Sequence, residues 1–171
     1  MYATIPSGVT SVEDNSLTNF VTYIYNVSAL YNVDESVLSN NVSVFPLTGF
    51  SGGDGSMDNP YLVSNPGELF TTRLYPTSYF RQIADIDLGI APWNTGEGWK
   101  PIGSFGNTFN GSYNGDGFTI SNLTINRPAE SAVGLFGSID GSTIKNINLT
   151  NVNITGNEYV AALAGDINNS N

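Results

Sequence analysis

Apolar and polar residues alternate over short stretches in the last third of the chain, and these stretches repeat. Residues 117–125 recur as residues 141–149, with an offset of 24 residues. Residues 134–139 recur more loosely as residues 162–167, with an offset of 28 residues. Short strands that are separated by Gly and Asn and recur with a period of about 20 to 30 residues are typical of a stacked solenoid. The pattern therefore predicts an all-β fold in which each turn buries its apolar side chains against the next.

Segments upstream of the repeat show matching strand and turn patterns. Residues 79–88 alternate as a strand, and residues 109–117 form a run of tight turns in which Asn-Gly and Asp-Gly pairs tolerate positive φ. A short helix start is also predicted, with Asn65 as the N-cap, Pro66 at the first position and Glu68 at the third. These segments extend the predicted solenoid towards the N-terminus.

Residues 1–50 follow a different pattern. Apolar residues recur there at the spacing of one helix face, at Leu17, Phe20, Val21, Ile24, Val27 and Tyr31. Asp14 or Asn15 is placed to cap this helix. Residues 42–47 alternate as a strand. The sequence therefore predicts a small, partly helical segment before the solenoid.

The boundary between the two parts is predicted at a Gly-, Asp- and Ser-rich loop over residues 49–59. We expect residues 1–50 to be an anchor or partner-binding segment. We expect residues 51–171 to form the β-solenoid.

Composition and charge narrow the class of protein. The chain of 171 residues is 40% hydrophobic and 12% charged, with a net charge of −10. Its five basic residues are scattered, so neither nucleic-acid binding nor attachment to anionic lipid is expected. The N-terminus lacks the pattern of a secretory signal, and no stretch reaches the roughly 20 apolar residues of a membrane span. We expect an extracellular protein on a virion or cell surface, without membrane insertion.

The chain has no Cys and no His. Their absence removes thiolate ligands, the commonest transition-metal ligand, the usual general base and the Ser-His-Asp arrangement. We therefore expect no cofactor and no enzymatic activity.

Carboxylates are the remaining catalytic candidates. Asp85 and Asp87 lie on the same face of a predicted strand, and Asp116 lies in a predicted turn. Two such groups could be the acid and base of a glycoside hydrolase. The alternative is a polar face at the edge of a solenoid turn, whose carboxylates accept hydrogen bonds from turn N–H groups.

Asp54 and Asp58 are candidate calcium ligands, because oxygen ligands are dense in their Gly-rich loop, and Asp85 with Asp87 is an alternative cation site. The loop fails the nonapeptide calcium pattern, since Met57 stands where Asp is required. It fails the EF-hand pattern as well, since it lacks the Glu at the twelfth position.

An aromatic-rich stretch supplies the candidates for binding. Trp93, Trp99 and Phe105 could stack on sugars or on a partner protein. The alternative is that aromatic rings such as Trp99 and Phe109 are buried at the end of the first turns.

Residues 109–125, followed by residues 133–137, resemble the GLUG-motif repeats of bacterial surface proteins. These repeats also occur in the non-catalytic part of some immunoglobulin-A-cleaving peptidases. Residues 53–63, 84–88 and 99–103 resemble the lead-in of such repeats. The likeness extends from about residue 53 to residue 167.

The resemblance implies a right-handed, parallel β-helix-like solenoid that is used for display or adhesion. It also implies turns at the repeat motifs, formed by Gly134, Leu135, Phe136, Gly137, Ala162, Leu163 and Gly165. Ala162 departs from the family pattern, which has Gly at this place.

We therefore expect a non-enzymatic fibre, spike or adhesin, in which an anchor precedes a β-solenoid shaft. A phage or virus particle is the first expectation for its location, and a bacterial surface is the second. A glycan-degrading enzyme and an accessory repeat domain of a secreted protease are the alternatives. The expected partners are other subunits of the assembly, further copies of the chain and a cell-surface glycan, because an open solenoid end invites pairing.

Overall fold

The computed structural model describes residues 4, 6–19, 21–32, 34–44, 46–47 and 49–171. The chain divides into two compact units, Met1–Leu47 and Thr48–Asn171. We refer to them as the N-terminal unit and the solenoid unit.

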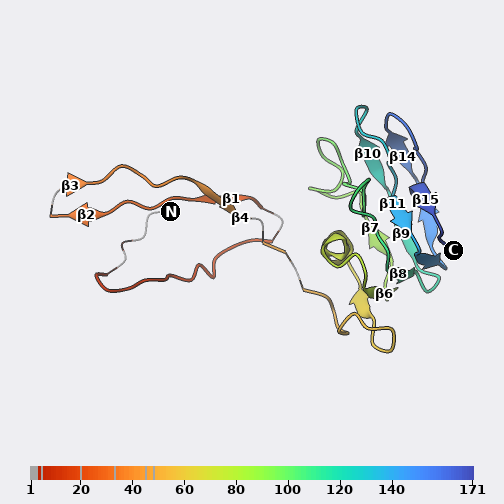
Figure 1. Cartoon of the computed structure of the whole chain (residues 1–171), viewed down its shortest axis with the longest axis horizontal. Coiled ribbons are helices and arrows are strands. Elements are labelled where there is room, and N and C mark those ends of the chain that lie inside the picture. Colours follow the sequence, from red (N-terminus) through yellow and green to blue (C-terminus); the bar gives the residue numbers. More distant parts are fainter. Residues whose placement is uncertain (1–3, 5, 20, 33, 45, 48) are drawn as a thin grey trace. The chain divides into compact units, whose positions relative to one another are not determined.

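The N-terminal unit contains two nested antiparallel strand pairs (Figure 1). The outer pair joins β1 (Tyr23–Tyr25) to β4 (Val42–Val44), and the inner pair joins β2 (Leu30–Tyr31) to β3 (Asp34–Glu35). Together they form one long hairpin. The predicted strand over residues 42–47 is confirmed for the three residues of β4.

The predicted helix in residues 16–31 is wrong, since β1 and β2 lie there instead. The helical spacing of apolar positions was misleading because β-branched and aromatic residues, which favour extended backbone, occupy many of them. Asp14 does not cap a helix; it accepts hydrogen bonds from Ser16 and from the Tyr25 hydroxyl. Phe20 and Phe45, which belong to the predicted helix and strand, lie outside the described residues.

Within residues 49–171, the solenoid unit has four parallel sheets. The first contains β5 (Tyr61–Val63), β6 (Tyr79–Gln82), β8 (Ser112–Asn114) and β12 (Thr143–Lys145). The second contains β7 (Ile86–Asp87), β9 (Thr119–Ser121) and β13 (Asn148–Thr150). The third and fourth pair β10 (Thr124–Asn126) with β14 (Asn153–Thr155) and β11 (Phe136–Asp140) with β15 (Ala164–Asn168).

This pairing stacks about three turns of chain, which we number as residues 79–111, 112–142 and 143–171. The strands of one turn lie in register on those of the next, as the blue and cyan arrows of Figure 1 show. The predicted all-β solenoid is thereby confirmed.

Apolar side chains stack in columns through the interior. Phe80, Tyr113 and Ile144 form one column, because each pairs with the next across neighbouring strands. Phe80 and Tyr113 are buried, whereas Ile144 in the third turn is half-buried. Side chains on either side of these residues point outwards, because successive residues of a strand face opposite sides.

A short helix, α1 (Pro66–Thr71), follows β5 and continues into a 3-10 turn, η1 (Thr72–Leu74). Its start matches the prediction: Asn65 is the N-cap, and its Oδ1 accepts from the Glu68 N–H at 3.0 Å. Glu68 in turn accepts from the Ser64 N–H at 2.6 Å, which resembles a capping box. Across the ranges that the structure describes, no helix is long and apolar enough to cross a membrane.

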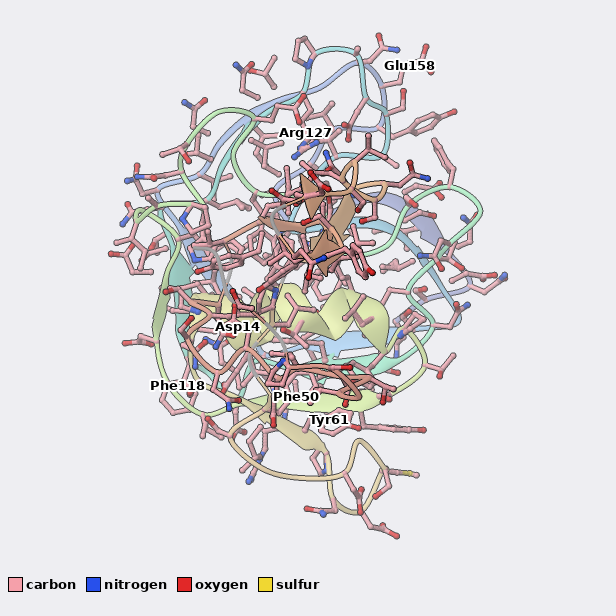
Figure 2. The ribbon with its side chains drawn as sticks, turned by 90° about the vertical axis from the view of Figure 1, so that its left-hand side faces the viewer. Asp14, Phe50, Tyr61, Phe118, Arg127 and Glu158 are labelled. Carbon is pink, nitrogen blue, oxygen red and sulfur yellow. The ribbon has the colours of Figure 1, made fainter. Side chains whose placement is uncertain are left out.

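Helix α1 closes one end of the stack. Leu69 is fully buried, and the Phe70 ring lies 4.9 Å from Trp93 and 5.9 Å from Trp99 of the first turn. Figure 1 shows the yellow-green helix beside the first turn, with the blue third turn at the opposite end. Phe50 and Tyr61 stack at 4.3 Å before the first turn, and Figure 2 shows their rings together.

The register of the turns corrects one sequence repeat. Residues 136–139 of the second repeated stretch lie on residues 164–167 with the predicted offset of 28. Residues 117–125 do not lie on residues 141–149, because Ile120 pairs with Leu149, an offset of 29. The two similar stretches are therefore different corners of successive turns.

Candidate functional site

The two strand carboxylates hold turns of the solenoid in place. Asp85 accepts from the backbone N–H of Thr119 at 2.8 Å. Asp87 Oδ1 accepts from the Gly89 N–H at 2.8 Å and from the Asn122 side chain at 2.7 Å. These hydrogen bonds are the ones expected if Asp85 and Asp87 belong to a polar face at the edge of a solenoid turn.

Asp87 also has the wrong acidity for a general acid. The side-chain hydrogen bond from Asn122, followed by the backbone hydrogen bond from Gly89, lowers its pKa. A glycosidase acid requires a raised pKa. Asp87 is therefore poorly suited to be the acid of a glycosidase pair. Asp116, the third candidate, sits exposed in the turn after β8, where its N–H donates to Asn114 Oδ1 at 3.1 Å.

The Gly-rich loop folds on itself. Asp54 Oδ1 accepts from the Ser56 N–H at 3.0 Å, and the hydrogen bonds from Ser56 lower the Asp54 pKa. The N–H groups of Asp54 and Gly55 both donate to the Asn59 carbonyl, at 3.0 and 3.1 Å. Asp58 lies exposed in the same loop. Among the described residues, no group of three or more His, Cys, Asp or Glu is arranged to hold a metal ion.

The aromatic candidates divide into buried and exposed rings. Trp99 is 0% exposed and Trp93 is buried, so these two rings cannot stack on a sugar. Their prediction as binding residues is wrong, because the indole rings fill the interior next to α1. Phe105 is 53% exposed and packs edge-on against Tyr159 at 5.8 Å.

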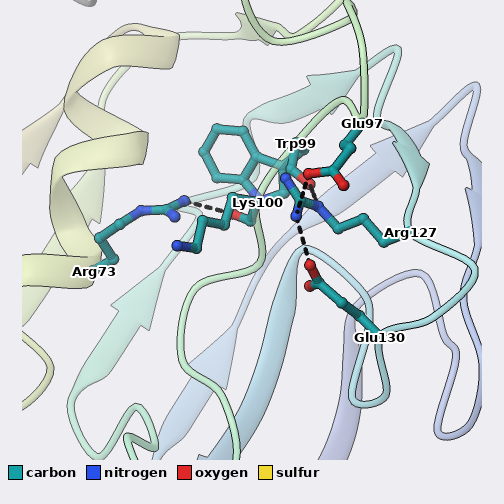
Figure 3. Close-up of polar contacts among 6 residues, drawn as sticks. All are labelled: Arg73, Glu97, Trp99, Lys100, Arg127 and Glu130. Carbon is teal, nitrogen blue, oxygen red and sulfur yellow. Dashed lines mark hydrogen bonds and ion pairs between the residues drawn. The ribbon is translucent and has the colours of Figure 1, made fainter. Parts of the chain in front are cut away.

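Trp99 is held by a polar network around its backbone (Figure 3). Its indole N–H donates to the Leu135 carbonyl at 3.1 Å, and its own carbonyl accepts from Arg127 Nε at 3.2 Å. Arg127 also forms ion pairs with Glu97 at 3.0 Å and with Glu130 at 2.8 Å. The network fixes the loop before Ile102 against the second turn.

Arg73 reaches the same loop from η1. Its Nη2 donates to the Lys100 carbonyl, and its guanidinium lies 3.7 Å from the centre of the Phe70 ring. Burial, with a smaller contribution from the charge of Arg127, lowers the Arg73 pKa to about 9. Arg73 therefore stays charged at neutral pH and serves packing.

The repeat motif residues pack backbones closely, and several of them do not form turns. Phe136 and Gly137 lie in β11, and Gly165 lies in β15, so their prediction as turn residues is wrong. A Cβ on Gly137 would come within 2.3 Å of the Gly103 carbonyl oxygen. A Cβ on Gly165 would meet the Tyr159 carbonyl oxygen at the same distance. The motif therefore needs glycine for close approach rather than for positive φ. Gly134 and Leu135 precede β11, and Ala162 and Leu163 precede β15.

The third turn exposes apolar side chains whose register partners in the second turn are buried. The pairs, with exposed fractions, are Val133 (0%) and Val160 (42%), and Ile139 (3%) and Ile167 (59%). Leu135 (0%) and Leu163 (37%), which directly precede the paired residues Phe136 and Ala164, differ in the same way. Asn171 lies beside the start of this turn: its N–H donates to the Ser142 carbonyl at 2.8 Å, and its carbonyl accepts from the Ile144 N–H at 2.8 Å. Within residues 49–171, no further turn covers these apolar side chains.

A second feature is an open groove of about 490 Å³ on the outer face of β6, β8 and β12. Its floor carries two cations, Arg81 and Lys145, on either side of Asn114. No local pattern in the sequence marks these residues, because offsets of 33 and 31 residues bring them together. Knowledge of the strand register would have been needed to find them.

The named relatives of this chain are much longer than the chain itself. Residues 102–171 match the family described as M26 IgA1-specific Metallo-endopeptidase N-terminal region. The chain is 35% identical over 158 residues to a protein of Evansella cellulosilytica named putative Gly-rich membrane protein, covering 91% of this chain and 17% of that protein. It is 38% identical over 126 residues to Halomucin of Haloquadratum walsbyi, covering 70% of this chain and 1% of that protein. No solved structure matches. The chain thus resembles a short part of two much longer proteins.

Proposed function

We propose that this chain is a non-enzymatic structural module, a β-solenoid shaft used for display or adhesion on the outside of a cell. One observation carries the proposal: α1 covers one end of the stack, while the third turn leaves the other end open. Terminal turns of solenoids need a cap, because each turn is stable only when both of its faces are covered. The open end is therefore the place where this module joins a further layer of β-structure.

The open end offers both driving forces for such stacking. Val160, Leu163 and Ile167 are partly exposed, and covering side chains of this size contributes about 1 kcal/mol each. Apart from the contact between Asn171 and the start of β12, the strands of the third turn also present an unpaired edge, which favours pairing with another chain. A further solenoid turn or a second copy of the chain would cover these side chains and pair with this strand edge.

An outer cell surface is the proposed location. The relative named putative Gly-rich membrane protein supports this place, and neither named relative supports the phage or virus particle that the sequence first suggested. We assign the N-terminal unit to attachment. Its hairpin leaves Ile24, Leu30 and Val37 exposed, so it has apolar surface for a partner.

A role as accessory domain of a secreted protease is the second candidate. The match of residues 102–171 to the N-terminal region of a metallo-endopeptidase family favours it. This candidate predicts that the same polypeptide carries a peptidase domain. It also predicts that this peptidase captures its substrate less well when the solenoid is deleted. Unchanged capture contradicts it.

The oligomeric state of the chain tests the main proposal. In sedimentation velocity, we expect the wild-type chain to associate as its concentration rises. Ile167→Lys places a charge on the open end and should keep the chain monomeric. Ile90→Lys is the matched control, because Ile90 is about equally exposed but lies in the first turn. A wild-type chain that stays monomeric at high concentration contradicts the proposal, as does equal association of the wild type and Ile167→Lys.

An assay for glycan hydrolysis tests whether the chain is an enzyme. We expect no release of reducing sugar from surface glycans. Release that is lost in both Asp85→Asn and Asp87→Asn would show instead that the chain is a glycan-degrading enzyme.

A further inference from the structure

We propose that the groove on the outer face of β6, β8 and β12 binds an acidic oligosaccharide, with Arg81 and Lys145 holding its carboxylates. The groove lies on the side of the solenoid, so binding there does not depend on how the open end is covered. The inference is therefore independent of the stacking proposed above.

Strand register builds the floor of the groove. Arg81 pairs with Asn114, and Asn114 pairs with Lys145, so the three outward side chains form one row across three turns. Neighbouring strands are about 4.8 Å apart, which places the two cations about 10 Å apart at their Cα atoms. Tyr79 and Thr143 flank Ser112 in a second, parallel row. The groove therefore presents two rows of polar groups along the stack.

The two cations are available for a ligand. In the part of the chain that the structure describes, neither the Arg81 side chain nor the Lys145 side chain forms an ion pair or a hydrogen bond, and both residues are exposed. Arg127, in contrast, is paired with two glutamates. In a chain with a net charge of −10, two unpaired cations on one wall attract an anion that the rest of the surface repels. The arginine can bind a carboxylate through two parallel hydrogen bonds.

The remaining lining suits a sugar better than a peptide. Short hydroxyl and amide groups supply both donors and acceptors, which matches the many hydroxyls of a saccharide. Tyr79 is partly exposed and offers a ring for the apolar C–H face of a pyranose. The backbones of β6 and β8 are paired on both sides within the sheet, so a peptide cannot add there as a strand.

Calorimetric titration of the full chain at low salt tests the inference. The probe is a hexamer of galacturonic acid, with a neutral galactose hexamer and hexaglutamate as comparisons. We expect the uronate hexamer to bind and its affinity to fall as salt rises. We expect Arg81→Gln and Lys145→Gln each to weaken binding about tenfold, since each removes a charge-assisted hydrogen bond.

Lys100→Gln is the matched control, because it removes the same charge from an exposed residue outside the groove. It should change the affinity by less than about twofold. Equal losses in Lys100→Gln and Lys145→Gln overturn the assignment, as does the absence of uronate binding. Equal or tighter binding of hexaglutamate also overturns it, because the site would then recognise acidic peptide. Equal binding of the neutral hexamer would show that the cations play no part.

Discussion

The side-chain amide of Asn122 donates to Asp87 Oδ1 at 2.7 Å and thereby joins the first turn of the solenoid to the second. Asn151 of the third turn donates to Asn122 Oδ1 in the same column. Asn122 and Asn151 both adopt a positive φ, of 58° and 52°. One corner of the solenoid is therefore held by a ladder of polar side chains whose backbone also favours asparagine.

The ladder predicts a cost for removing its central residue. Asn122→Ala loses both side-chain contacts and forces alanine into the left-handed region, so we expect the free energy of unfolding to fall by about 2 kcal/mol. Asn122→Gly keeps the backbone freedom and should lose about half as much. Asn126→Ala is the control, because Asn126 is exposed at the end of β10. Urea unfolding measures all three, and equal stability of Asn122→Ala and Asn126→Ala contradicts the ladder.

Asp87 should make the stability depend on acid. Its folded pKa lies below the unfolded value of about 3.9, chiefly because Asn122 donates to it. The stabilisation is therefore present above the unfolded pKa and is lost as the pH falls through the folded pKa. Asp87→Asn removes this titration, so its melting temperature should fall less steeply than that of the wild type below about pH 4. Parallel curves for the two proteins would contradict this role of Asp87.

The two classes of aromatic residue should respond differently to truncation. Trp99→Ala empties a fully buried site, and we expect a loss of about 3–5 kcal/mol of stability. Phe105→Ala removes an exposed ring that touches Tyr159, and we expect a loss below about 1 kcal/mol. Denaturant unfolding followed by circular dichroism compares them. A Phe105→Ala loss as large as that of Trp99→Ala would place Phe105 in the core, against the structure.

Close backbone approach at the repeat motif can be tested with one methyl group. In Gly137→Ala the new Cβ meets the Gly103 carbonyl oxygen, so β11 and the loop backbone at Gly103 must move apart. We expect a loss of more than about 2 kcal/mol, or failure to fold. Gly49→Ala is the control, since nothing lies within 4 Å of a Cβ there. Thermal melting distinguishes them, and unchanged melting of Gly137→Ala excludes the proposed packing role.

The sequence was sufficient to predict a solenoid, because Gly and Asn punctuation and short alternating stretches are local features. It was insufficient for the register. One short pattern recurs around Asn122, Asn146 and Asn151, which lie at successive corners. It consists of a branched apolar residue, a spacer, Asn and a second apolar residue. Two corners of different turns thus looked like equivalent positions. Only strand pairing, which depends on contacts distant in sequence, resolves them.

The surroundings of the candidate site residues could not be predicted from the sequence for a related reason. Asp85 and Asp87 share a strand face as predicted, but the groups that engage them, Thr119 and Asn122, come from the next turn. The helix start at Asn65 was predictable because its signals are local. The N-terminal hairpin was missed because its apolar spacing also fits one helix face.

The most direct test of the stacking account is hydrogen–deuterium exchange of the full chain, measured at low and at high protein concentration. Those amides of the third turn that donate to no carbonyl of the second turn should exchange readily in dilute solution. We predict that residues 143–171 gain protection as concentration rises, while α1 and β5 at the closed end do not change. Concentration-dependent protection that is confined to the hairpin of residues 23–44, or absent throughout, would contradict the claim that the open third turn is the stacking surface.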